Sequence, residues 1–435
     1  MLSAFVSAFR TPDLRKKLLF TLAIIVLYRL GASVPTPNTS TSAINECIKA
    51  ANNGASRDVY ALINLFSGGA LLKLSAFALG IMPYITASII IQLLVVVIPR
   101  FEQLKKEGQS GQQKLTQYSR YLTIGLAILQ STGFIALARS GQLFQGCNQQ
   151  ILYKEDIFTL STMVICMTAG TAVIMWLGEL ITDRGVGNGM SVLMFTSIAA
   201  RIPAEGNAIR QNGGNFIFVL VIALGLAIIA AVVFVEQAQR RIPVQYAKRM
   251  IGRRQYGGTS TYLPLKVNQA GVIPVIFASS LLYIPQLLSQ LQGNGTGTFQ
   301  RFVNRYLISQ TSWVHIGIYV VLIIFFAYFY VSITFNPVER ADDMKKYGGF
   351  IPGIRPGRPT AEYLQFVLSR ITLPGAMYLA IVAVLPNFFF SVTGGNNQNF
   401  PFGGTAVLIM VGVGLDTVKQ IESQLMQRNY EGFLR

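Results

Sequence analysis

The chain has 435 residues, of which 52% are hydrophobic and only 12% are charged, and its formal net charge is +18. Soluble domains carry roughly 25% charged residues, so this composition excludes a soluble enzyme held at a membrane by one anchor. We therefore expect an all-α polytopic membrane protein.

Long apolar segments recur along the whole chain. A helix needs about 20 mainly apolar residues to cross a bilayer, and ten segments meet this condition. We predict spans at 18–34, 77–98, 119–138, 157–180, 188–203, 214–236, 268–291, 313–335, 371–390 and 402–424. Lys and Arg are concentrated at the two termini and in alternate loops, which the positive-inside rule assigns to the cytoplasm. Both termini are then cytoplasmic.

One segment before the second span does not fit this pattern. Phe66–Ser75, "FSGGALLKLS", is largely apolar but too short to cross, and no polar loop separates it from the next span. It also contains Gly68, Gly69 and Lys73. Irregular structure at membrane depth is tolerated only where protein or a water-filled cavity surrounds it.

A weak internal repeat relates the second and seventh spans. "GIMPYITAS" (Gly80–Ser88) and "GVIPVIFAS" (Gly271–Ser279) share five of nine residues. Each is the second span of a five-span half, and an odd number of spans inverts one half relative to the other. Paired Gly/Pro-interrupted helices in inverted halves indicate a pathway between the halves. We divide the chain into halves 1–212 and 213–435; chance similarity of two apolar helices is the alternative explanation of the repeat.

Two predicted cytoplasmic loops are longer and richer in basic residues than the positive-inside rule requires. Residues 237–267 contain seven basic residues and no acid, and are predicted to form a hairpin-like protrusion. Residues 336–365 are rich in Gly and Pro, which favour turns, and place Arg355 and Arg358 at their tip. We expect both loops to dock a partner. Phosphates of RNA, anionic lipid head groups and an acidic protein surface all remain candidates.

Catalytic and cofactor chemistry is not indicated by the residues. His315 is the single histidine, there is no G-x-x-x-x-G-K-[ST] loop, and no Cys/His spacing indicates a metal. Ion-coupled transporters usually carry Asp or Glu within their spans, whereas the midplane polar residues here are neutral. The sequence favours a channel driven by partners over a secondary transporter with inverted repeats. A membrane-embedded enzyme is the third alternative.

Three cysteines occur in the chain. Cys47 and Cys147 fall in predicted external loops, where a disulfide between them is permitted. Nothing in their spacing shows proximity, so two unrelated free thiols are the expected state.

Several long motifs resemble the bacterial SecY family. They include "ITDRGVGNGMS", "RRIPVQYAKR", "LPLKVNQAGVIPVIFASS", "NPVERADDMKKYGGFIPGIRPG" and "FGGTAVLIMVGVGLD". The resemblance covers all ten spans. It implies two inverted five-helix halves around a central hourglass pore, with a short re-entrant plug helix at about 61–75. It also implies a protein-conducting channel that translocates unfolded secretory polypeptides and releases hydrophobic segments laterally into the bilayer.

The resemblance assigns roles to residues of this chain. The apolar pore ring would be Ile81, Ile85, Met190, Met194, Ile276 and Ile409. The plug would include Phe66, Ser67, Gly68, Gly69, Leu71, Leu72, Lys73, Leu74 and Ser75. The lateral gate would carry Thr86, Gln130 and Asn268. Docking would use Arg240, Arg241, Lys248, Arg249, Arg253, Arg254, Arg355 and Arg358.

The resemblance also implies partners and a location. The expected partners are the SecE and SecG subunits, the SecA motor ATPase, the ribosome, signal peptides and secretory precursors, with YidC and SecDF as further candidates. The expected location is the bacterial cytoplasmic membrane. No cofactor or metal is expected, because the driving energy would come from the partners.

Overall fold

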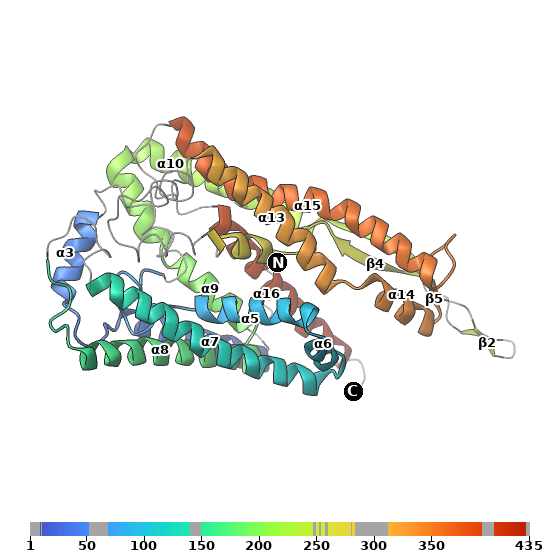
Figure 1. The fold of residues 1–435 in the computed structure, drawn as a ribbon. Coiled ribbons are helices and arrows are strands. Elements are labelled where there is room, and N and C mark those ends of the chain that lie inside the picture. The colour runs from blue at the N-terminus through green and yellow to red at the C-terminus, as the bar shows by residue number, and fades with distance from the viewer. Residues whose placement is uncertain are drawn as a thin grey trace.

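A computed structural model describes residues 9, 11–51, 68–139, 149–246, 249–251, 254–256, 260–279, 281–282, 312–393 and 404–431. Helices make up most of this part of the chain (Figure 1). They are α2 (Pro12–Ser33), α3 (Thr41–Ala51), α5 (Met82–Val97), α6 (Pro99–Lys106), α7 (Gln109–Arg139), α8 (Ile157–Arg184), α9 (Gly189–Ala199), α10 (Ile202–Gln237), α13 (Trp313–Thr334), α14 (Pro337–Lys346), α15 (Arg358–Thr393) and α16 (Gly404–Glu431).

The helices confirm an all-α polytopic membrane fold. Within the described residues, six helices are long and apolar enough to cross a membrane, in α7, α8, the second part of α10, α13, α15 and α16. The pair α5 and α6, bent by 101°, is a candidate for a seventh crossing. Helix α2 covers the predicted first span, and the short apolar α9 covers the fifth. The predicted seventh span, 268–291, is described only in its first part.

The bend between α5 and α6 follows from local sequence. Ile98 is extended (φ −101°, ψ 112°) and precedes Pro99, and a residue before proline is pushed away from helical geometry. Helix α6 then turns away from α5 and buries Leu104 against residues that include Val95 and Leu115. The second span therefore ends at Val97.

Helix α10 is interrupted near the predicted boundary between the halves. Gly214 has φ 76° and ψ 174°, which breaks the helix into two parts. Glycine adopts positive φ without the cost that a Cβ would impose. The predicted boundary at 212/213 falls beside this break.

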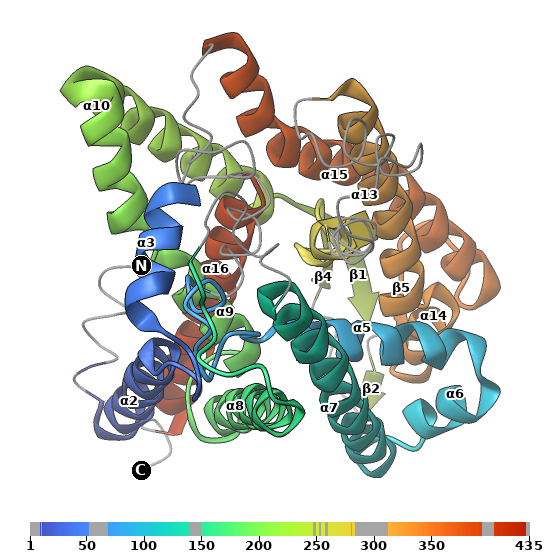
Figure 2. The same ribbon diagram turned by 60° about the vertical axis from the view of Figure 1, so that its left-hand side comes forward.

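The helices are arranged around two central elements. In Figure 2, α9 and α16 lie in the middle, and α2, α8, α7, α13, α15 and α10 surround them. Helix α9 contacts α2, α8 and α16, while α16 also contacts α10 and α15. Residues from both halves of the sequence therefore meet at the centre.

A small sheet joins the two long loops. Strands β1 (Gln239–Tyr246) and β4 (Ser260–Lys266) pair antiparallel, with Gln239 opposite Lys266. Strand β5 (Gly349–Phe350) adds to the other edge of β1, with Gln245 opposite Phe350. Strands β2 (Arg249–Ile251) and β3 (Arg254–Tyr256) form a second hairpin near the tip, and β2 lies beyond β5 and α14 in Figure 1. The predicted hairpin is confirmed; its pairing with the second loop was not foreseen.

The sheet has one buried face. Ile242 and Val244 of β1 are buried while the residues between and around them are exposed, which is the alternation expected of a strand with one face on a core. Ile242 packs in a cluster with Leu265, Ile351 and side chains of α13 and α15. The protrusion is thus fixed to the ends of two long helices.

Candidate functional site

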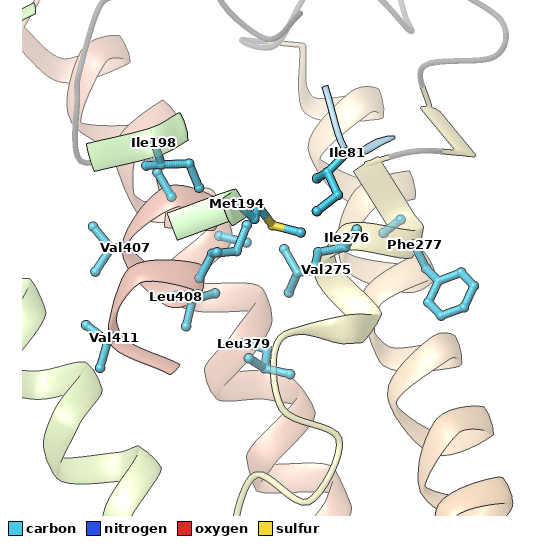
Figure 3. Close-up of a cluster of buried hydrophobic side chains, with 14 of the residues drawn as sticks. Ile81, Met194, Ile198, Val275, Ile276, Phe277, Leu379, Val407, Leu408 and Val411 are labelled. Carbon is cyan, nitrogen blue, oxygen red and sulfur yellow. The ribbon is translucent and has the colours of Figure 1, made fainter. Parts of the chain in front are cut away.

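The six predicted ring residues come together in one apolar cluster. Ile81, Met194, Ile276 and Ile409 are buried, and Ile85 and Met190 are half-buried and packed against them. We call these six residues the waist cluster. They come from the start of α5, from α9, from the helical residues 273–279 and from α16, so both halves contribute. Figure 3 shows Ile81, Met194 and Ile276 pointing into the shared space between these elements.

The surroundings of the waist cluster are also apolar. Ile198, Val275, Leu408 and Leu379 lie around it in Figure 3 and are buried. An apolar constriction loses its water and thereby blocks ions. Met190 and Met194 are one helical turn apart on α9, and methionine side chains adapt to irregular shapes. The cluster can therefore seal against itself and reshape around another chain.

Glycines bring α8 and α9 unusually close behind the waist cluster. A Cβ added to Gly178 would overlap the sulfur of Met190, and one added to Gly189 would overlap the carbonyl of Gly178. Helix α9 begins immediately after Asn188, whose side-chain oxygen accepts from the N–H groups of Met190 and Ser191 at 3.1 and 3.4 Å. This cap satisfies two N–H groups that helix starts leave unpaired.

The plug segment, Gly68–Ser75 in the structure, is a series of turns and not a regular helix; Phe66 and Ser67 lie outside the described residues. Positive φ angles at Gly68 (64°), Gly69 (87°) and Leu74 (45°) prevent a continuous helix. Leu71, Leu72 and Leu74 are buried in a second apolar cluster with residues of α3, α7 and α8, while Lys73 is exposed. These leucines therefore pack against α3, α7 and α8, and none of them belongs to the apolar cluster that holds the six waist residues.

The two ends of the plug segment are held differently. At its C-terminal end, Thr36 donates to the carbonyl of Leu74 from both its backbone N–H and its hydroxyl, and Ala76 N–H donates to the carbonyl of Val34. At its N-terminal end, the Arg29 guanidinium donates to the carbonyl of Gly68 at 3.4 Å. The C-terminal end is thus held by three short hydrogen bonds. At the N-terminal end, the part of the chain that the structure describes shows the single long bond from Arg29.

The predicted gate residues do not bond to one another. The Thr86 hydroxyl donates to the carbonyl of Met82 in its own helix, and Gln130 is half-buried on α7. Asn268 is buried and donates to Oε2 of Glu236 at 3.0 Å and to the carbonyl of Gly271 at 3.1 Å. Sequence reasoning missed Glu236 as a partner, although a carboxylate at the end of a span was a usable signal.

The predicted docking residues lie on the two joined loops. Arg240 and Arg241 are exposed on β1, and Arg355 and Arg358 are exposed before and at the start of α15. Arg249 and Arg254 lie on β2 and β3. Lys248 and Arg253 fall outside the described residues. The sheet therefore brings Arg240 and Arg241 onto the same protrusion as the loop that carries Arg355.

One expectation about the cysteines is wrong. Cys47 is disulfide-bonded and fully buried in α3, whereas Cys166 is free. Cys147 lies outside the described residues. An oxidising compartment permits such a bond, and spacing alone could not show that Cys47 had a partner within reach.

The fold is that of protein-conducting channels. A solved structure described as "The structure of a protein conducting channel" superposes with a TM-score of 0.63 and 18% identity, covering 94% of this chain and 91% of that one. Another, "Sec61 in the Canine ribosome-channel complex from the endoplasmic reticulum", has a TM-score of 0.61, 19% identity and the same coverage. A third is described by its plug domain, which "stablizes the closed state of the translocation channel", with a TM-score of 0.62.

Closer relatives define the family. The SecY family model matches residues 75–418. The protein translocase subunit SecY of Mycobacterium tuberculosis is 66% identical, and that of Streptomyces coelicolor is 64% identical, each over the full length of both chains. The chain belongs to the SecY family.

Proposed function

We propose that the chain is the channel subunit of a protein translocase, which passes unfolded secretory polypeptides across the cytoplasmic membrane and releases hydrophobic segments sideways into the lipid. The observation that carries this proposal is the waist cluster, in which six apolar side chains from both halves meet at the centre of a multi-pass membrane protein. Such a constriction blocks ions when closed and offers no polar group to hold a passing chain.

Each remaining part of the site takes a role in this proposal. The plug segment (Gly68–Ser75) closes the funnel next to the waist cluster and moves aside when a chain enters. The gate opens between helices α5 and α7 on one side and the seventh and eighth spans on the other. Thr86, Gln130 and Asn268 are neutral polar groups there, and hydrogen bonds between spanning helices contribute only about 1 kcal/mol. An apolar signal helix can replace interactions of that strength.

Partners supply the energy and dock on the protrusion. The exposed arginines of β1 and the Arg355 loop fit the phosphates of ribosomal RNA or an acidic surface of the SecA motor ATPase. We further propose the small subunits SecE and SecG as companions in the membrane, with YidC and SecDF as transient ones. Both termini then lie in the cytoplasm.

A secondary transporter is the competing function. It requires ionisable relays in the middle of the spans. Asp416 lies near the middle of the span Gly404–Met426, but it is exposed and pairs with Lys266 at 3.7 Å. Glu236 occupies the last turn of α10 and accepts a hydrogen bond from the amide of Asn268. Neither position favours a relay.

Reconstitution tests the proposal. Inverted vesicles depleted of this protein are supplied with the chain, SecE and SecA, and ATP-dependent uptake of a secretory precursor is measured by protection from protease. We expect uptake to return only when ATP and the chain are both present. Uptake that stays at the depleted level would refute the channel function.

A further inference from the structure

We propose that Glu236 and Asn268 form a clasp that transmits movement of the docking arm to the seventh span. The docking arm is the β1–β4 hairpin, residues 239–266. The proposal rests on the proposed function and deepens it, because it assigns Glu236 as a positioning residue between the docking surface and the gate.

The clasp lies where both strands of the arm enter the membrane part. Helix α10 ends at Gln237 and β1 begins at Gln239, while β4 ends at Lys266. The Val267 N–H donates to the carbonyl of Ala238 at 3.0 Å, which continues the hairpin ladder by one bond. One step further, Asn268 Nδ2 donates to Oε2 of Glu236 at 3.0 Å. The sixth span and the entry to the seventh are thus tied by adjacent bonds.

Asn268 also fixes the chain that follows it. Its Nδ2 group donates to the carbonyl of Gly271 at 3.1 Å, and an amide nitrogen has two hydrogens to give. Both are therefore used, one toward α10 and one toward the start of the seventh span. Gly271 has φ 61°, and Val275 and Ile276 donate to the carbonyl of Val272 to begin the helix. Ile276 of the waist cluster stands in this first turn.

The segment between arm and helix has no backbone ladder of its own, although Ala270 is buried in the cluster below the sheet. Residues 267–272 form bends and turns without regular structure. Helix α15 packs closely beside them, since a Cβ on Gly375 would overlap the carbonyl of Val267. The Glu236–Asn268 bond, at 3.0 Å, is the side-chain link between this segment and α10. Lys266 and Lys419 attract the same carboxylate, and Asp416 repels it.

Because of these contacts, the docking arm and the first turn of the seventh span move together. A partner that tilts the arm moves Glu236 and Asn268 together, and Ile276 with them. Without the clasp, residues 267–272 become a soft joint that absorbs the movement. Docking does not require either side chain, because Asn268 is buried and Glu236 is half-buried, whereas the arginines of β1 are exposed.

Matched variants separate this role from simple stability. Glu236→Ala removes the acceptor, whereas Glu236→Gln keeps an oxygen for Asn268. Asp416→Ala is the control, because Asp416 is an exposed acid that pairs with Lys266 at 3.7 Å and does not touch Asn268. In vesicles with the complete complex, we measure binding of the motor ATPase and ATP-driven precursor uptake.

We expect Glu236→Ala to bind the motor normally and to lower uptake by about tenfold, within the range usual for coupled sites. Glu236→Gln and Asp416→Ala should remain within about twofold of the original chain, since a neutral hydrogen bond retains most of the geometry. Unchanged uptake in Glu236→Ala would overturn the clasp. Equal loss in Glu236→Gln, equal loss in Asp416→Ala, or lost motor binding in Glu236→Ala would do the same.

Amide hydrogen exchange provides a readout that needs no transport. In the purified complex, Glu236→Ala should speed exchange at residues 267–276 and leave β1 unchanged, while Glu236→Gln should match the original chain. Uniform exchange in all three proteins would refute the clasp even if uptake fails. If the original chain itself supports no uptake, the channel function fails, and the exchange result still decides the clasp.

Discussion

Thr36 binds the carbonyl of Leu74 twice, from its backbone N–H at 2.9 Å and from its hydroxyl at 2.8 Å. This buried pair of hydrogen bonds fixes the C-terminal end of the plug segment to the chain that follows α2. The other end is held by Arg29 through the 3.4 Å bond to Gly68. We infer that the segment swings about the Thr36 clamp when Arg29 releases.

The clamp yields the first prediction. Thr36→Val removes the hydroxyl but keeps the backbone bond, at a cost of about 1 kcal/mol. The plug should then leave its closed position more often, and ion conductance of idle channels in planar bilayers should rise. Ser75→Ala is the matched control, because the buried Ser75 hydroxyl has no hydrogen-bond partner among the described residues. Equal conductance in the two variants would contradict the clamp.

Neighbouring glycines give a second, paired prediction. Gly68 and Gly69 both have positive φ, so alanine costs about 1–2 kcal/mol of backbone strain at either position. At Gly68 the new Cβ would also lie 3.1 Å from the Arg29 guanidinium and 3.2 Å from Ser197, whereas at Gly69 the space is open. Gly68→Ala should therefore leak more ions than Gly69→Ala. The reverse order of conductance would show that the Arg29–Gly68 bond does not hold the plug segment closed.

A polar substitution tests whether the waist cluster seals the closed channel. Ile276→Asn or Ile409→Asn places an amide in an apolar site where both side chains are buried, and an unsatisfied buried polar group costs roughly 1–3 kcal/mol. A loss of about 1.4 kcal/mol from the closed state corresponds to a tenfold shift, so export of precursors with defective signal sequences should rise about tenfold.

The same substitution away from the waist cluster is the control. Ile165 is 68% exposed on the outer surface of the described helices, and Ile165→Asn should leave signal stringency unchanged. The amount of each variant in the membrane is measured in parallel by immunoblotting. Normal stringency in both waist variants at normal levels would show that these isoleucines are ordinary packing residues.

Charge reversal tests the docking surface. Arg355 is exposed between turns, and its carbonyl accepts from the Thr360 hydroxyl at 2.9 Å. Because that bond uses the backbone carbonyl of Arg355 and not its side chain, Arg355→Glu should keep the fold. The reversed charge should oppose a complementary partner, and export driven by the motor should fall by about tenfold or more. Arg139→Glu reverses an exposed charge at the far end of α7 and should export normally. Normal export by Arg355→Glu would exclude Arg355 from the docking surface.

The sequence was sufficient to predict those features that local patterns determine. Hydropathy located the helices, and the resemblance named six waist residues that the structure brings together. Gly68 and Gly69 signalled irregular backbone, but not that Leu74 would also adopt positive φ. The carbonyl of Leu74 accepts both hydrogen bonds from Thr36, a contact distant in sequence that local pattern does not reveal.

Pairings between remote segments could not be foreseen in the same way. The bond from Asn268 to Glu236 requires that the whole hairpin between them folds back on itself. Strand β5 is only two residues long, too short for any alternation to be visible. The disulfide state of Cys47 likewise depends on which chain segment comes near it.

Strand β1 is the middle strand of its sheet, with β4 on one edge and β5 on the other. The sheet therefore joins two loops, the one between the sixth and seventh spans and the one between the eighth and ninth spans. Under the proposed function, a partner that docks on either loop acts on both, and through them on two pairs of spans. Substitutions in one loop should consequently produce defects that resemble damage to the other.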